Sequence, residues 1–343
     1  MSFNKFMLKI ILASVTLLLA TGVQAEGRLT VYCSMQDAWC QATVKAFGEK
    51  YDVKTAMTHS GSGSTFAKIS AEKNNPKADV WIGGTADPHL QAGELGLLQS
   101  YVSPNMKELG KMFQNIAIKG DNTTDGIYAG VVGYSVNTKM AKDMGIAIPS
   151  SWEDLTDPKY KGNIRMASPQ SSGTAYTVLA TIVQLWGEEI AFEYLARLHP
   201  NIDQYTKSGS AGQKAAARGE VLIGIGFLHD ASKLVKSGFP LKLVTPSEGT
   251  GFEIGGLSII KGARNLENAE KFVDWALSAE GQNIAAPTGA FQVPTNMNAI
   301  VPKEAFDLSK VNLIDYDFKT YGSNTTRKHL INRWAMDIKP LAR

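Results

Sequence analysis

Short β-rich runs alternate with segments of helical spacing through the first quarter of the chain, and this alternation restricts the fold most. Residues 28–33, 52–59 and 78–84 have the composition or the period of strands. Residues 38–50 and 66–74 lie between them and have helical spacing. Strands and helices that alternate in this way form parallel α/β sheets with right-handed crossovers. The sequence therefore predicts an α/β fold whose ligands bind beyond the carboxyl ends of the strands.

A second α/β pattern follows, and two predicted strands connect it to the first. We interpret these strands, residues 128–137 and 251–260, as crossings between two lobes that form a hinge and leave a cleft. Near the C-terminus, residues 269–286 have the clearest helical pattern, with Asn268 as the expected cap. The predicted limits are residues 26–132 and 253–315 for the first lobe, and 133–252 and 316–343 for the second.

Residues 1–25 have the pattern of a secretory signal peptide. Lys5 and Lys9 precede an apolar run from Ile10 to Ala20, and Val23-Gln24-Ala25 is a small-x-small cleavage site. The run is shorter than the ~20 apolar residues of a membrane-spanning helix. We therefore expect an exported, soluble mature chain of about 318 residues, which is long enough for two domains.

Charge and cysteine content restrict the function classes. Removal of the predicted leader takes away two lysines and no acidic residue, so the formal net charge falls from +3 to +1. This charge gives no reason to expect binding to nucleic acid or to a membrane surface. In an exported chain, Cys33 and Cys40 favour a disulfide, with two buried thiols or a metal pair as alternatives.

Small hydroxyl residues and one glycine lie where a predicted strand turns into a helix, at residues 171–174. The start of a helix exposes unpaired backbone N–H groups with partial positive charge, which favours an anion. The alternative is an ordinary helix cap, because serine and threonine are the usual capping residues.

Residues 60–65 are a second candidate for an anion site. They alternate glycine with hydroxyl residues before the helix predicted from Phe66, a pattern that can form a backbone cradle. The segment lacks the Gly-Lys-Ser/Thr ending of a Walker A loop and the third glycine of a dinucleotide fingerprint. A flexible turn with a serine or threonine cap is the alternative.

Three further polar residues are candidates for ligand contacts. His229 and Asp230 end a predicted strand, and Glu253 lies in a glycine-rich apolar crossing. Imidazole and carboxylate groups both form hydrogen bonds with hydroxyls. The alternatives are a surface histidine beside a helix-capping aspartate, and a solvent-exposed strand end. No Ser-His-Asp or Cys-His arrangement is recognisable, so an exported hydrolase of phosphate esters is the least favoured function.

Several segments carry a family resemblance. They are residues 30–34, 78–84 and 149–162, followed by 171–174 and 217–221. Across both lobes the chain resembles the periplasmic substrate-binding proteins of ABC importers, in particular their ferric-binding-like cluster. The resemblance implies a two-lobed, type II-like fold that closes about a hinge on a ligand in the interlobe cleft. It further implies no catalysis and no cofactor. The expected protein is a monomeric receptor in the periplasm, with an inner-membrane ABC permease as partner.

The position of the iron-binding Tyr-Tyr pair of that cluster holds Phe227-Leu228-His229-Asp230 here. The chain is most similar to the hexose-phosphate-binding (Afu-type) members, which implies a sugar phosphate as ligand and no metal. A ferric-ion binder with a synergistic anion, or a phosphonate or phosphoglycerate binder, is the alternative. The resemblance implies that the phosphate binds at residues 171–174, with further contacts from residues 62–65. It implies that the sugar hydroxyls bind at His229, Asp230 and Glu253. The full set of expected ligand-binding residues is Ser34, Ser62, Gly63, Ser64, Thr65, Thr85, Ser171, Ser172, Gly173, Thr174, His229, Asp230 and Glu253.

Overall fold

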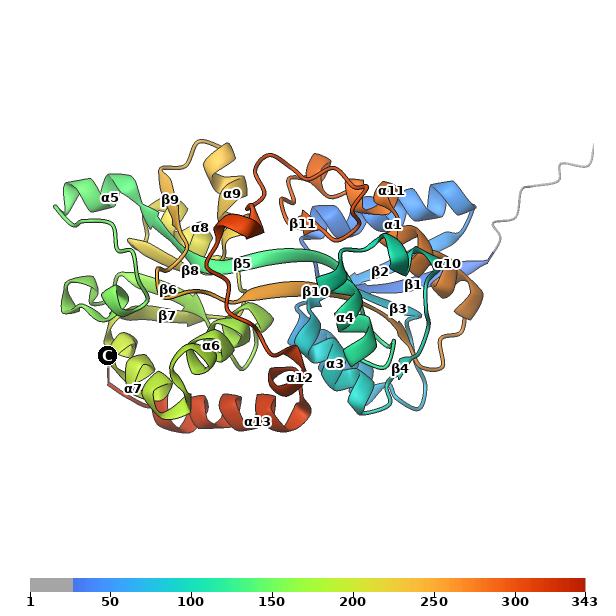
Figure 1. The fold of residues 1–343 in the computed structure, drawn as a ribbon, viewed down its shortest axis with the longest axis horizontal. Helices are drawn as coiled ribbons and strands as arrows, with labels where there is room; N and C mark the ends of the chain where they lie inside the picture. The colour runs from blue at the N-terminus through green and yellow to red at the C-terminus, as the bar shows by residue number, and fades with distance from the viewer. Residues whose placement is uncertain (1–26, 343) are drawn as a thin grey trace, which may run out of the picture.

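Two long strands run through both halves of the molecule (Figure 1). β5 (Asp125–Asn137) and β10 (Phe252–Ile260) are buried along their whole length. β5 pairs with β10 as far as Val131, and from Val132 onward it pairs with β8 (Ile223–Phe227). β5 therefore passes from one sheet to another, with a lobe on each side. This computed structural model describes residues 27–342.

The first lobe has the strand–helix alternation that the sequence predicts. β1 (Arg28–Cys33) pairs in parallel with β2 (Lys54–His59) and β3 (Val80–Thr85), and β10 is antiparallel to β3. α1 (Asp37–Tyr51) and α2 (Ser62–Ala71) connect the three parallel strands. The other main elements of this lobe are α3 (Ala86–Glu94), β4 (Leu98–Gln99), α4 (Lys111–Lys119), α10 (Leu266–Leu277), α11 (Ala279–Asn283) and β11 (Val293–Pro294).

The second lobe repeats this architecture. Its strands lie in the order β5-β8-β6-β7, in which β6 (Ile164–Ala167) is parallel to both β8 and β7 (Ile202–Thr206). β9 (Leu241–Val244) pairs with the far end of β5. The helices around this sheet are α5 (Thr138–Asp143), α6 (Gly173–Trp186), α7 (Glu188–Leu198), α8 (Ala211–Arg218) and α9 (Leu228–Lys236). The predicted α/β class with two lobes and two crossings is confirmed, whereas the limits of the lobes stay a prediction.

The C-terminal part departs from the predicted helix at residues 269–286. Two helices occupy it, because the chain breaks at Ser278, whose hydroxyl accepts from Gly281 N at 3.2 Å and caps α11. α10 begins earlier than expected, so Asn268 lies inside it and donates to Arg28 O at 3.1 Å; its prediction as a cap was wrong. Farther along, α12 (Phe318–Tyr321) and α13 (Asn324–Arg333) lie against both lobes (Figure 1).

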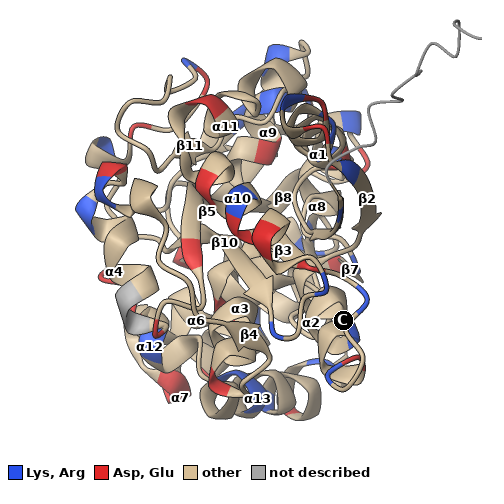
Figure 2. Cartoon of the chain, turned by 90° about the vertical axis from the view of Figure 1, so that its right-hand side faces the viewer, with Lys and Arg blue, Asp and Glu red and all other residues tan. Residues whose placement is uncertain are grey.

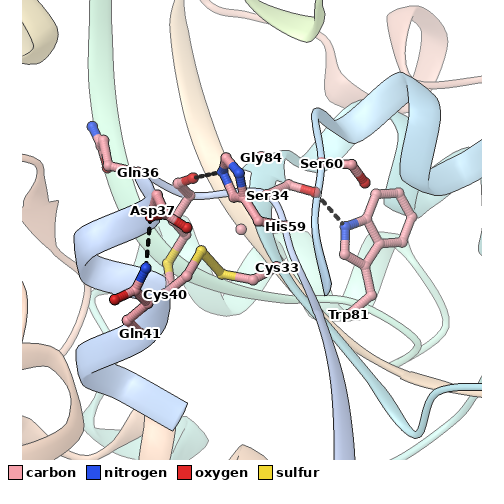
Figure 3. The surroundings of a disulfide bond; sticks show 12 residues. Cys33, Ser34, Gln36, Asp37, Cys40, Gln41, His59, Ser60, Trp81 and Gly84 are labelled. Atoms are coloured by element: carbon pink, nitrogen blue, oxygen red, sulfur yellow. Dashed lines mark hydrogen bonds between the residues drawn. A yellow bond between two sulfur atoms is a disulfide. The ribbon is translucent and has the colours of Figure 1, made fainter. Parts of the chain in front are cut away.

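A disulfide joins Cys33 at the end of β1 to Cys40 in α1, as predicted, with 5.9 Å between the two Cα atoms (Figure 3). Both cysteines are fully buried. The bond holds the short turn of residues 34–36 between strand and helix. That turn lies at the carboxyl end of β1, where the fold predicts a ligand.

The predicted signal peptide lies outside the described residues. Within residues 27–342, none of the helices combines the length and the apolar character that a membrane crossing requires. Lysines and arginines are interspersed with acidic residues over the end of the first lobe (Figure 2). The distribution agrees with the small net charge of the sequence.

Asp125, at the start of β5, is a buried carboxylate of the first lobe. It is 5% exposed, and its Oδ1 atom has no hydrogen-bond partner within the described part of the chain. Burial, and to a smaller extent the charge of Asp274, raises the pKa of Asp125 to about 7. The folded protein therefore holds a proton at Asp125 that the unfolded chain releases above about pH 4.

Because this pKa is raised on folding, stability should fall as the pH increases from about 4 to about 7 and stay lowered above that range. We predict that Asp125→Asn matches the wild type near pH 4 and exceeds its stability at pH 8, by up to about 4 kcal/mol. Thermal unfolding from pH 4 to 8 measures this, with the exposed Asp315→Asn as control. A D125N profile parallel to that of the wild type would contradict it.

Candidate ligand-binding site

Three helices begin close together where the two lobes meet. α2 begins at Ser62 and α3 at Ala86 in the first lobe, and α6 begins at Gly173 in the second. A Cβ atom added to Gly173 would lie 2.6 Å from both Ser62 Oγ and Thr85 Oγ1, so the helix starts face each other closely. The first N–H groups of a helix have no partners within it and carry partial positive charge. The arrangement therefore favours an anion between the lobes.

Hydroxyl groups of the first lobe surround this position. Ser34 Oγ lies 3.1 Å from Thr65 Oγ1, which in turn lies 2.7 Å from Ser60 Oγ. Trp81 Nε1 donates to Ser34 Oγ at 3.0 Å (Figure 3). Thr85 Oγ1 is buried and has no hydrogen-bond partner within residues 27–342. A buried polar group without a partner costs about 1–3 kcal/mol, so the Thr85 hydroxyl is a candidate donor to a bound ligand.

The glycine–serine segment becomes helical earlier than predicted. The helix expected from Phe66 begins at Ser62, with Gly61 as its extended N-cap residue. The prediction was wrong because Thr65 is fully buried and contacts the hydroxyls of Ser34 and Ser60, rather than lying free in a loop. Residues 62–65 are thus the first turn of α2, and their N–H groups are those of a helix start.

Ser172 caps α6, since its Oγ accepts from Ala175 N at 3.3 Å, which confirms the capping alternative. The sequence analysis missed the neighbouring loop, residues 206–210. A Cβ atom on Gly209 would lie 2.1 Å from Thr174 Oγ1, so this loop packs against the start of α6. It follows β7, whose parallel pairing with β6 brings both carboxyl ends to one edge. The Ser-Gly-Ser pattern before α8 was the available signal.

A second polar group lies where β5 and β10 cross between the lobes. His229 Nε2 lies 3.6 Å from Glu253 Oε1 and 3.9 Å from Asp230 Oδ1. Gly130 leaves the space for it, because a Cβ there would lie 2.4 Å from His229 Nδ1. His229 and Asp230 lie in the first turn of α9 rather than at a strand end, since that helix already begins at Leu228.

Burial decides the protonation of this group. It lowers the pKa of His229, although the charge of Asp230 acts in the opposite direction. It raises the pKa of Glu253 well above its ordinary value, and the charges of Asp230 and Asp87 raise it further. A neutral imidazole and a carboxylic acid are therefore favoured, and each can donate one hydrogen bond and accept another. His229 Nδ1 is buried without a partner in the described part of the chain.

Three side chains that the sequence analysis did not single out form hydrogen bonds at the candidate site. Gln36 Nε2 donates to Asp230 Oδ1 at 3.0 Å from one lobe to the other, and Gln292 Nε2 donates to Gln36 Oε1 at 3.1 Å. Tyr128 OH accepts from Gly84 N at 3.0 Å. These partners are far apart in the sequence, so no local pattern could have indicated them.

The predicted site residues fall into two groups, with one outside both. Gly63 and Ser171 face each other, since a Cβ on Gly63 would lie 3.7 Å from Ser171 O. Ser64 is exposed on the first turn of α2, and no contact joins it to either group in the described part of the chain. The first group contains Ser34, Ser62, Gly63, Thr65, Thr85, Ser171, Ser172, Gly173 and Thr174, and the second contains His229, Asp230 and Glu253. Among residues 27–342 there is no cluster of three or more His, Cys, Asp or Glu side chains that could hold a metal ion.

A family of bacterial extracellular solute-binding proteins matches residues 75–320. The chain belongs to this family. Proteins of this family bind small molecules and deliver them to ABC permeases. An uncharacterized protein of Haemophilus influenzae is 52% identical over 347 residues, which cover 99% of each chain. A more distant relative, the Fe(3+)-binding periplasmic protein of Serratia marcescens, is 20% identical over 321 residues, 89% of this chain and 92% of its own.

Solved structures of solute-binding proteins show the same fold. The periplasmic binding protein AfuA of Actinobacillus pleuropneumoniae, with exogenous fructose-6-phosphate bound, is 56% identical with a TM-score of 0.90. The periplasmic binding protein P5PA is 45% identical with a TM-score of 0.88. Each comparison covers 92% of this chain and 100% of the other. The predicted two-lobed fold and the predicted family are therefore confirmed.

The close approach at Gly173 gives a test of the interlobe contact. In Gly173→Ala, the added methyl group would meet the Ser62 and Thr85 hydroxyls, and overpacking of this kind costs about 1–3 kcal/mol. We predict that separation of the lobes relieves this overpacking, so the unfolding temperature of the ligand-free variant should stay close to that of the wild type. The lobes should be farther apart in small-angle scattering. The control is Gly61→Ala, where a Cβ meets nothing within 4 Å. Equal scattering of G173A and wild type would contradict the expected separation.

Proposed function

We propose that this protein is a periplasmic receptor that captures a sugar phosphate of the hexose 6-phosphate class and delivers it to an ABC permease. The observation that carries the proposal is the meeting of three helix starts from both lobes around the unpartnered Thr85 hydroxyl. A phosphate monoester has three terminal oxygens, which can accept from several such donors at once.

The phosphate group would bind at the first group of site residues. The starts of α2, α3 and α6 lie close together at the meeting of the two lobes, and each helix start favours negative charge. The Ser62 and Thr85 side chains would add hydroxyl donors. Closure of the lobes on the ligand would exclude water and strengthen these interactions.

The sugar would bind at the second group. A neutral imidazole at His229 and a protonated Glu253 each provide a donor and an acceptor, and Asp230 provides acceptors. Hydroxyl groups of a sugar need this mixture, whereas an apolar ligand would leave these buried groups without partners. The solved relative with fructose-6-phosphate bound, more than half identical in sequence, supports the same ligand class.

The periplasm is the expected location. The predicted leader at residues 1–25 would direct export, and the Cys33–Cys40 disulfide suits an oxidising compartment. The related Fe(3+)-binding protein is named as periplasmic, which supports the same placement. The mature chain would act there as a monomeric receptor without enzymatic activity.

Isothermal titration tests the ligand class directly. We predict saturable one-to-one binding of fructose 6-phosphate or glucose 6-phosphate, much stronger than that of inorganic phosphate. His229→Ala should weaken hexose phosphate binding at least about tenfold, because it removes hydrogen bonds to the sugar and leaves the phosphate group in place. The exposed His329→Ala serves as control.

Other results of the same titrations would favour the alternatives. Heat with 2-aminoethylphosphonate or phosphoglycerate alone would favour those ligands. A visible charge-transfer band on addition of ferric ion, with no heat from any sugar phosphate, would favour the ferric-ion alternative and overturn the proposal.

Glu253 gives a pH-dependent test. Because burial raises its pKa, the proton on Glu253 is held near neutral pH and is lost as the pH rises through that raised pKa. Loss of the proton adds a negative charge near a dianionic ligand, so wild-type affinity should fall with increasing pH. Glu253→Gln keeps a neutral group of the same shape and should remove this fall, while Glu253→Ala should weaken binding at every pH. Titrations from pH 6 to 9 measure both, and an unchanged profile in E253Q would refute the assigned protonation.

A further inference from the structure

The C-terminal segment, residues 316–334, touches both lobes behind the candidate site. On the side of the first lobe, Tyr316 OH donates to Asp87 Oδ1 at 3.4 Å, and Asn324 N donates to Glu94 Oε2 at 3.2 Å. On the side of the second lobe, Arg333 pairs with Glu188 at 2.6 Å. α13 accordingly runs along the underside of the molecule, beneath α6 and α7 (Figure 1).

Arg327 of α13 enters the space between the two lobes. Its guanidinium lies 4.1 Å from the centre of the Tyr176 ring, in the first turn of α6. Its charge lowers the pKa of Asp87, in the first turn of α3, against a larger effect of burial that leaves this pKa at about 6. α3 and α6 are two of the helices whose starts face each other at Thr85 and Gly173. Arg327 therefore lies beside the first turns of α3 and α6, whose starts line the candidate anion site.

Two observations indicate that the guanidinium is not fully used by these contacts. Arg327 is 7% exposed, and among the lysines and arginines whose side chains the structure describes it alone is buried. Its Nη1 atom is buried and has no hydrogen-bond partner within residues 27–342. A buried charged donor without a partner is strongly unfavourable, so a bound acceptor is expected there.

We propose that Arg327 is a further ligand-binding residue, whose guanidinium donates from Nη1 to an oxygen of the bound phosphate group. The inference rests on the proposed function. A buried phosphate dianion needs positive charge in addition to the partial charges of helix starts. In the site described above, His229 is neutral and Asp230 is acidic, so Arg327 supplies the full positive charge. The planar guanidinium also matches the geometry of phosphate oxygens.

The test compares two esters of the same shape and different charge, fructose 6-phosphate and fructose 6-sulfate. Arg327→Met should weaken binding of the dianionic phosphate ester roughly 10- to 100-fold, and that of the monoanionic sulfate ester much less. Arg327→Lys, which keeps the charge without the planar fork, should fall between R327M and the wild type. Lys328→Met, at the exposed neighbouring position, is the matched control and should bind as the wild type does.

Asp87→Asn provides a second variant in case R327M does not fold. Removal of the carboxylate frees the guanidinium, so phosphate ester affinity should increase severalfold if Arg327 binds the ligand. An equal loss for both esters in R327M, or weaker phosphate binding in D87N, would mean that Arg327 only ties the lobes together. A wild-type protein that binds neither ester would overturn the proposed function and the role of Arg327 together.

Discussion

The closed arrangement of this protein brings helix starts of like partial charge face to face across the lobes. α2 and α3 approach from the first lobe and α6 from the second, with only a hydroxyl layer between them at Gly173. Partial positive charges at such short range repel each other, and the repulsion is strong where water is excluded. An anion converts the repulsion into attraction from both sides. In the proposed receptor, closure and anion binding would therefore be coupled by elementary electrostatics, since the closed state would gain most from the ligand.

The polar group at His229 and Glu253 is matched to this constraint, because it is buried and uncharged. Glu253 and His229 are almost completely buried, and burial shifts both pKa values toward the neutral form. Two uncharged groups beside Gly130 therefore add no field that would compete with the helix starts for the anionic end. This difference would orient the proposed ligand, because one end of the site favours charge and the other end offers donors and acceptors to neutral hydroxyls.

Local patterns predicted much of this fold, and distant contacts account for what they missed. The strand–helix alternation gave the α/β class, and the serine at position 172 was recognised as a possible cap because capping depends on adjacent residues. The start of α2 could not be located at Ser62, since the contacts of Thr65 that bury it involve Ser34, 31 residues away. Gln36 could not be recognised either, because its partners Asp230 and Gln292 follow 194 and 256 residues later. Polar residues buried by the fold are ambiguous in a sequence until their neighbours are known.

The two ends of the site differ in their distance from the hinge, so opening of the lobes should displace the residues of one end more than those of the other. Glu253 pairs in register with Gly130 on β5, immediately before that strand changes sheets at Val131 and Val132. Groups at a pivot move little when the lobes open, so hydroxyl recognition near Glu253 can begin before closure. Thr85 and Gly173 belong to different lobes, and their separation must increase on opening. For the proposed sugar phosphate, binding of the charged end would therefore depend on closure, whereas the neutral end would bind beside the pivot.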